Sequence, residues 1–183
     1  MKKSAFTMLE LVFVIVVIGI LAAAIIPRMD RDTVYEASEQ LLSHIKYTQH
    51  LAMTDNVYDD TDANWFQNRW LITFDAGNET YSISKGTGTS YALDPLTKQE
   101  IDGTDDYDLD NKYSATIDLD YPTGTAAADP FTLVFDHLGR PHSGVGGSVS
   151  NILANDLNIT ITASGETANI IVIQETGYSY IEW

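Results

Sequence analysis

The stretch from Phe6 to Pro27 reads FTMLELVFVIVVIGILAAAIIP, and it decides how the chain is organised. Only Thr7, Glu10 and Gly19 interrupt an otherwise apolar run that continues up to the proline. As an α-helix this run measures about 32 Å, which is close to the thickness of a bilayer core. The stretch therefore predicts a helix that spans a membrane, with one carboxylate near its beginning.

Three kinds of segment fit such a run behind the two lysines at positions 2 and 3. One is a secretory signal peptide that is cut after the alanines at 22–24, and another is a plain membrane anchor. The third is a leader that is cut before the run, so that the run stays in the mature protein. The lysines place the N-terminus in the cytoplasm in each case.

Glu10 separates these interpretations. A carboxylate in a membrane helix costs about 2.5–3.5 kcal/mol at the bilayer centre and less near its end, so it is expected to have a function and a partner. The candidate partner is the α-ammonium that cleavage between Ala5 and Phe6 would create. This reasoning favours the third interpretation.

Composition excludes several classes of protein. The chain has 183 residues, which suits one domain with an appendage, and a formal net charge of -16. Phosphate recognition needs clustered Lys and Arg, so nucleic acid is not an expected partner. The absence of cysteine rules out thiol catalysis, thiolate zinc sites and disulfides.

Helical periodicity continues after Pro27. Apolar or small residues recur at steps of three and four, and acidic residues occupy the other side. The positions of this stripe are Val34, Ala37, Leu41, Ile45, Thr48 and Ala52. Turn-forming residues from Asp55 to Asp60 end the pattern, so one long helix is expected from about Phe6 to Asn56.

The remainder of the chain predicts strands and turns. Alternating apolar residues mark strands around 70–74, 81–83, 115–121, 131–135, 157–161, 171–173 and 178–183. A stretch rich in Gly, Thr and Asp from about Gly86 to Lys112 predicts a long loop. The expected fold class is α+β: a long N-terminal helix packed on an antiparallel sheet.

The beginning of the chain also carries a recognisable set of motifs. They are Lys2-Lys3-Ser4-Ala5, then Phe6-Thr7-Met8-Leu9-Glu10-Leu11-Val12, and then Ile18-Gly19-Ile20-Leu21-Ala22-Ala23 up to Pro27. Together they resemble the class III leader of type IV pilins and type II secretion pseudopilins. Ala5 departs from this family, which usually has Gly before the cut.

The resemblance implies an organisation of the chain. Prepilin peptidase would remove a leader at 1–5, and Phe6 would be N-methylated. A transmembrane, filament-core helix at 6–27 with a kink at Pro27 would continue as an amphipathic helix at 28–56, followed by a periplasmic β-rich, pilin-type domain at 57–183. The protein would cross the bacterial inner membrane once, with its N-terminus in the cytoplasm.

The resemblance also implies partners and a role for Glu10. In an assembled filament Glu10 would neutralise the Phe6 ammonium of a neighbouring subunit, and a wrong stagger would leave both charges unpaired. The implied partners are other pilin or pseudopilin subunits, prepilin peptidase and the inner-membrane assembly platform. No cofactor is implied.

Two weaker motifs point to a subtype. Residues 45–56, IKYTQHLAMTDN, resemble the helix end of H-type minor pseudopilins and FimT-like pilins, although Thr48-Gln49 stands where those carry Ala-Arg. Residues 135–140, FDHLGR, resemble a strand of the same group. The expected function is a minor pseudopilin of a type II secretion system, which acts by assembly rather than catalysis.

A dense acidic run is the main candidate for metal binding. Its members are Asp102, Asp105, Asp106, Asp108 and Asp110. Carboxylates at alternate positions can supply the oxygen ligands that calcium requires, and some pseudopilins bind calcium in their sheet region. The spacing of an EF-hand is absent, so a solvated acidic loop is the interpretation that we favour.

Other candidate sites are weaker. His137 and His142 flank a Gly-Arg-Pro turn without a third ligand, which predicts surface polar residues rather than a metal site. Residues 144–148, GVGGS, lack the Lys of a phosphate loop and predict a flexible connection.

Two alternative functions remain: a minor pilin of a type IV pilus, and a membrane-anchored periplasmic enzyme, for which no catalytic constellation is visible.

Overall fold

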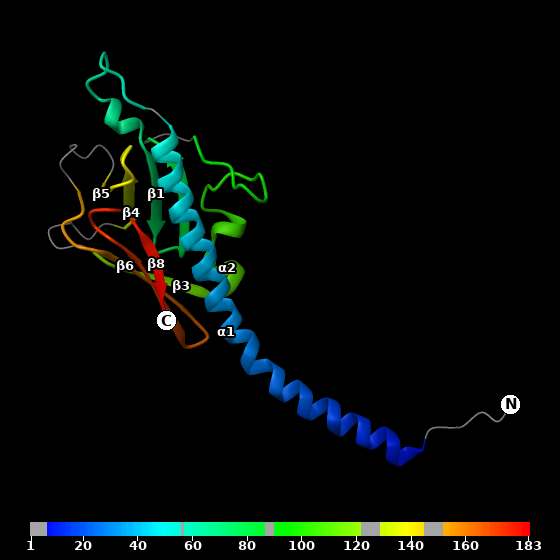
Figure 1. Ribbon diagram of the computed structural model, residues 1–183. Coiled ribbons are helices and arrows are strands. Elements are labelled where there is room, and N and C mark those ends of the chain that lie inside the picture. Colours follow the sequence, from blue (N-terminus) through cyan, green and yellow to red (C-terminus); the bar gives the residue numbers. More distant parts are fainter. Residues whose placement is uncertain (1–6, 56, 87–89, 122–128, 145–151) are drawn as a thin grey trace.

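The computed structural model describes residues 7–55, 57–86, 90–121, 129–144 and 152–183; within these, the side chains of residues 24–32 are not described. The chain is an α+β protein in which one long N-terminal helix packs on antiparallel sheets, as the sequence predicts (Figure 1). No helix in the described ranges has both the length and the apolar character needed to cross a membrane.

Helix α1 (Met8–Thr54) begins behind Thr7, whose hydroxyl caps the first turn. Its backbone is helical through Pro27, so the two predicted helical segments form one element. All six residues of the predicted stripe are buried, and Leu42 is buried beside them. Glu36, Glu39 and Lys46 are exposed on the other side. The second half of α1 is therefore a core helix.

The strands form two sheets rather than the single sheet that the sequence suggested. The first has the order β2-β1-β4-β5 and the second the order β3-β6-β7-β8, with antiparallel neighbours throughout. The bounds are β1 (Trp70–Asp75), β2 (Thr80–Lys85), β3 (Ala115–Asp120), β4 (Phe131–Phe135), β5 (Pro141–Ser143), β6 (Leu157–Ala163), β7 (Glu166–Val172) and β8 (Ser179–Glu182).

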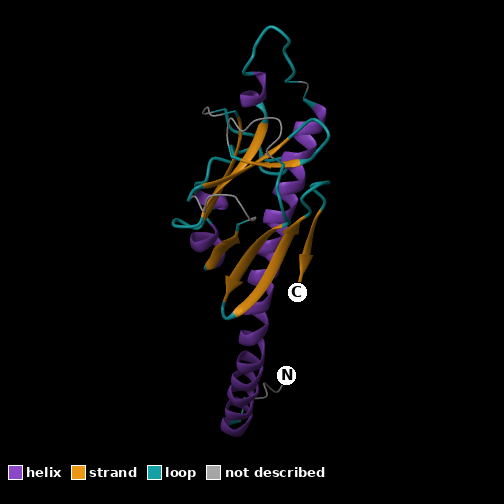
Figure 2. Ribbon diagram, turned by 90° about the vertical axis from the view of Figure 1, so that its left-hand side faces the viewer, coloured by secondary structure: helices purple, strands orange, loops and turns teal. Residues whose placement is uncertain are grey.

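Helix α1 contacts both sheets. It packs against β6, β7 and β8 of the second sheet and against β1 and β4 of the first. Figure 2 shows the strands of the two sheets arranged at successive levels along the upper half of the helix. Leu41 and Ile45 are fully buried in the same core cluster as Phe74 and Ile159, so the two sheets share one core that α1 completes.

The long loop predicted between residues 86 and 112 is confirmed for 90–104, which contain turns and isolated bridges, but it is wrong for 105–112, which are mainly helical. The Ala92 backbone N–H donates to the carbonyl of Ile83 in β2, the Ile83 N–H donates to Ile101, and the Ile101 N–H donates to Ala92, each over 2.9 Å. Two short helices follow, η2 (Asp105–Tyr107) and α2 (Leu109–Tyr113). Tyr107 and Leu109 are buried, as are Ala92 and Ile101. The segment therefore packs as part of the core, because its scattered apolar residues meet the edge of β2.

Strand β5 was also not predicted, because its three residues follow a turn and begin with a proline. Backbone pairing with β4 positions it, with His142 opposite Val134. The remaining short helix, η1 (Trp65–Asn68), precedes β1.

Candidate functional site

The first half of α1 projects away from the sheets (Figure 1). Most large apolar side chains between Met8 and Leu21 are more than half exposed, and Met8 is 87% exposed. Such a continuous apolar surface is far larger than the isolated exposed apolar residues of ordinary soluble domains. It therefore requires a cover that the single chain does not supply.

Glu10 lies in the first turn of this segment. The Glu10 backbone N–H donates to the Thr7 hydroxyl over 3.3 Å, so its position at the start of α1 is set by the cap. A carboxylate in the first turn interacts favourably with the helix dipole. Ala5 and Phe6, the predicted processing residues, lie outside the described residues, and so does the side chain of Pro27. The predicted pairing of Glu10 with Phe6 of a neighbouring subunit stays a prediction.

The acidic run does not form a cluster. Asp108 caps α2 by accepting the Asn111 N–H over 2.9 Å, and Asp106 pairs with Lys112 over 3.1 Å. Asp102 accepts both the backbone N–H and the hydroxyl of Thr104, at 3.0 and 2.7 Å.

Asp105 lies in η2 and Asp110 in α2. Over the described residues, no three acidic or histidine side chains come close enough to hold a metal ion. Calcium binding by this run stays a prediction.

The two histidines of the 137–142 turn lie in different environments. His137 is exposed, as predicted, but the surface position predicted for His142 is wrong, because His142 is only 2% exposed. Its Nε2 lies 3.3 Å from the buried Asp136, which also accepts from Arg140 Nε over 2.7 Å. Burial lowers the pKa of His142, and the nearby Asp136 carboxylate partly offsets this lowering. Asp136 thus stabilises this turn through its hydrogen bonds and interacts with His142 in the interior.

A buried polar network on α1 was not predicted. Gln40 Nε2 donates to the Tyr81 hydroxyl oxygen over 2.7 Å, and that hydroxyl lies 2.7 Å from His44 Nδ1. The other ring nitrogen of His44 lies 3.4 Å from Asp94 Oδ2, which also accepts from the Tyr107 hydroxyl over 3.2 Å. The helical stripe could have revealed His44, which lies three residues after Leu41 and four before Thr48.

Donor and acceptor counting assigns the tautomer of His44. The Gln40 carbonyl oxygen accepts from Lys112 and Tyr113, so its amide group donates to Tyr81. Tyr81 must then donate its own proton to His44 Nδ1, which leaves Nε2–H to face Asp94. His44 is therefore neutral, and burial lowers its pKa below the usual value.

The Tyr81–His44–Asp94 chain follows the order of a nucleophile, a base and an orienting acid. However, Tyr81 is only 1% exposed, and burial raises the pKa of its hydroxyl well above the usual range. Substrate cannot reach this hydroxyl, and it is a weak nucleophile. The network connects α1 to β2 and to the segment after it, and Gln40, His44, Asp94 and Tyr107 also line a hollow of about 240 Å³.

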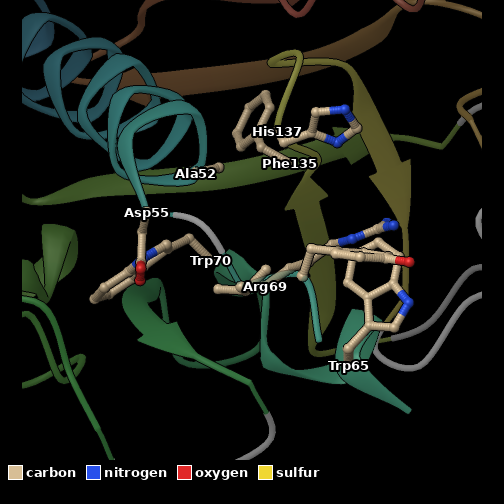
Figure 3. Close-up of a pocket in the computed structure, with 9 residues that line it drawn as sticks. Ala52, Asp55, Trp65, Arg69, Trp70, Phe135 and His137 are labelled. Atoms are coloured by element: carbon tan, nitrogen blue, oxygen red, sulfur yellow. The ribbon is translucent and has the colours of Figure 1, made fainter. Parts of the chain in front are cut away.

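A pocket of about 470 Å³ lies at the C-terminal end of α1 (Figure 3). Aromatic residues dominate its walls, including Trp65 of η1, Trp70 of β1 and Phe135 of β4. The Arg69 guanidinium stacks 5.1 Å from the centre of the Trp65 ring. Asp55 at the wall is neutralised by Lys85 at 2.7 Å and accepts the Trp70 indole N–H at 2.9 Å. Asp55 is thus satisfied, whereas Nη2 of the buried Arg69 has no hydrogen-bond partner among the described residues, so the mostly apolar wall also contains one buried cation.

Fold and site together define an α+β domain carried on a helix whose segment Met8–Leu21 is exposed and apolar and contains one carboxylate, Glu10. No family model, no curated protein and no solved structure matches this chain.

Proposed function

We propose that this chain is a structural subunit of a filament assembled from the bacterial inner membrane, and specifically a minor pseudopilin of a type II secretion system. The observation that carries the proposal is the exposed apolar first half of α1, from Met8 to Leu21. In the sequence this apolar run continues to Ile26. Lipid would cover this apolar surface before assembly, and neighbouring helices would cover it in the filament.

Glu10 supplies the element of specificity. In an apolar bundle a lone carboxylate is unfavourable, and the ammonium of a mature Phe6 would be equally so. Pairing the two charges between neighbouring subunits removes both penalties at one axial stagger only. Glu10 would therefore set the register of the helices in the filament.

The globular part would act through contacts with other subunits rather than through catalysis. The Tyr81 hydroxyl, the candidate nucleophile of its polar network, is fully enclosed. Its net negative charge disfavours a role in DNA uptake, which requires a basic surface. The domain would face the periplasm, at the outer surface of the filament.

Mass spectrometry of the mature chain tests the proposal. We expect a chain that begins at Phe6 and carries one additional methyl group on its α-amine. The Ala5→Gly variant, which restores the residue usual before the cut in the resembled family, is the positive control for processing. A chain that retains Met1, or one that begins at Ile25, would contradict the proposal.

A minor pilin of a type IV pilus would use the same apolar segment. Co-purification separates the two machines: pseudopilins should accompany the tagged full-length chain if it belongs to a secretion system. Recovery of pilus subunits instead would assign it to a pilus.

A further inference from the structure

The turn formed by residues 94–99, which we call the Asp94 turn, presents an isolated apolar side chain. Leu96 at its apex is 91% exposed, the largest exposure among the large apolar residues that the structure describes. The Asp94 carboxylate accepts the backbone N–H groups of Leu96 and Thr97, at 2.6 and 3.2 Å. Asp94 and Gln99 close the base of the turn through a backbone bond of 2.8 Å. The apex is therefore held in a defined conformation.

The buried network fixes this turn to the body of the protein. The second oxygen of the Asp94 carboxylate is held by Tyr107 and faces His44 on α1. The Tyr47 hydroxyl of α1 donates to the carbonyl of Leu93, the residue before the turn, over 3.0 Å. A side chain presented on so well anchored a turn loses little conformational freedom on binding, which favours association.

The mostly apolar pocket at the end of α1 is a complementary feature on another side of the molecule. Its volume of about 470 Å³ accommodates an aliphatic side chain and the residue before it. Val57 and Tyr58 line both this pocket and an adjoining polar hollow, whose wall includes Asp59, Asp60 and Asp62. The same wall contains Lys85, which pairs with Asp55, so the three aspartates leave the rim of the pocket net acidic on that side.

The two features lie on opposite sides of α1. In Figure 1 the segment around residues 90–104 (bright green) lies on one side of the upper part of the helix, and η1 (teal) lies on the other. One copy therefore cannot insert its own turn into its own pocket. Two copies standing side by side with parallel helices can bring the turn of one to the pocket of the next.

Charge complementarity supports the same pairing. Lys98 stands two residues after Leu96 on the exposed turn, and it is one of only ten basic residues in the chain. With Leu96 in the pocket, Lys98 would approach the acidic rim. In a chain with a formal charge of -16, a random contact between two copies would set like charges against each other.

We infer that the Asp94 turn of one copy inserts Leu96 into the apolar pocket of a second copy, as a lateral contact between globular domains. The contact is heterologous, because different surfaces of the two copies meet, and repetition of such a contact produces open helical assemblies rather than closed dimers. This inference rests on the proposed filament function and adds to it a contact outside the helical core.

Cysteine cross-linking of the full-length chain in membranes tests the contact, and the chain has no cysteine of its own. Two differently tagged copies are co-expressed, one with Leu96→Cys and one with Val57→Cys, so that every disulfide between them joins two molecules. The matched control replaces Leu96→Cys with Thr116→Cys, an exposed position on the edge strand β3. A Val17→Cys pair reports separately on contacts between the projecting helices.

We expect the Leu96–Val57 pair to form a mixed disulfide dimer at least about tenfold more efficiently than the Thr116–Val57 pair or a Leu96–Leu96 pair. Equal yields for these pairs would overturn the inference. If Val17 cross-links form while Leu96–Val57 yields stay at the control level, the lateral contact is wrong and the filament proposal stands. If Leu96–Val57 cross-links form without Val17 contacts, the lateral contact stands and the filament proposal fails.

A substitution at the apex provides a second, independent measurement. Leu96→Glu in the Val17→Cys background leaves the helix contact intact but removes the insertion into the pocket. Because Leu96 makes almost no contact within its own chain, folding is expected to be unchanged, as circular dichroism would verify. Copies with this substitution should pellet as assemblies about tenfold less efficiently than copies with Lys46→Glu, an exposed control on α1. Equal pelleting of the two variants would contradict the inference.

Discussion

Glu10 and His44 lie on the same helix in opposite environments. Glu10 is an exposed carboxylate among apolar side chains, and His44 is a buried imidazole among polar groups. Within the described residues, the environment of His44 is complete, with Tyr81 and Asp94 on its two ring nitrogens. Under the proposed function, a second molecule would supply the partner of Glu10.

Under the proposed function, substitution Glu10→Ala should leave cleavage after Ala5 intact, because the peptidase would act before the helix, but it should greatly reduce incorporation into filaments. The reduction follows from the loss of the intersubunit charge pair. The measurement is the fraction of mature chain in a sheared filament preparation, with Glu39→Ala, an exposed carboxylate on the same helix, as the control. Incorporation at the wild-type level would refute the pairing.

Acid should destabilise the protein through its buried histidines. Burial lowers the pKa of both His44 and His142 below the usual value of 6.5, so the unfolded chain binds protons more readily than the folded one. The free energy of unfolding is therefore highest above about pH 6.5 and falls as the pH drops through and below that value.

Urea unfolding of the full chain in detergent at pH 7.5 and at about pH 5 measures this loss. His44→Gln should be less stable at pH 7.5 but should show a smaller further loss at the lower pH. His50→Gln, an exposed histidine on α1, is the control and should behave as the wild type. A pH dependence unchanged by His44→Gln would show that this imidazole does not titrate on unfolding.

Among the elements, the end of α1 depends on a close contact between two turns. Gln49 Nε2 donates to the carbonyls of Gly139 and Thr176, at 2.9 and 3.0 Å, so one side chain connects α1 to both turns. Gly177 has a φ of +67°, and an added Cβ there would overlap the Gly139 carbonyl oxygen. The packing of α1 against the sheets therefore excludes any side chain at this position.

Substitutions at two glycines distinguish the cost of backbone strain from the cost of steric overlap with neighbouring atoms. Gly165, in the β6–β7 turn, has a φ of +84° and open space around it, so Gly165→Ala should cost about 1–2 kcal/mol from the left-handed backbone alone. Gly177→Ala has the same backbone strain and also displaces Gln49, so it should lower the free energy of unfolding by distinctly more than Gly165→Ala does. Urea unfolding measures the stability of both variants. Equal losses of unfolding free energy would show that the turn around Gly177 moves to make room for the added side chain.

Over the whole molecule, negative charge opposes the compact state. A formal charge of -16 on 183 residues produces self-repulsion that salt screens, so the melting temperature should rise as ionic strength increases. Calcium and magnesium chloride at equal ionic strength should raise it equally if the acidic run is only solvated. Stabilisation by calcium at concentrations too low to screen charge would instead assign a calcium site to that run.

The fold class and most elements follow from the sequence, because they depend on local periodicity. The 3.6-residue repeat from Val34 to Ala52 identifies the buried face of α1, and period-two alternation identifies β1, β3, β4 and β6. Each of these patterns lies within one segment. The apolar run with Glu10 is equally local, which is why the sequence alone suggested an assembling subunit.

Only the tertiary structure decided which segments meet. The division into two sheets, the packing of the segment after residue 90, the Tyr81–His44–Asp94 network and the pocket beside Trp65 each join residues far apart in the chain. His44 and Asp94 illustrate the reason: neither has a distinctive local pattern, and each becomes informative only beside the other. Hydrogen bonding and burial are properties of such pairs, and no periodicity within one segment encodes them.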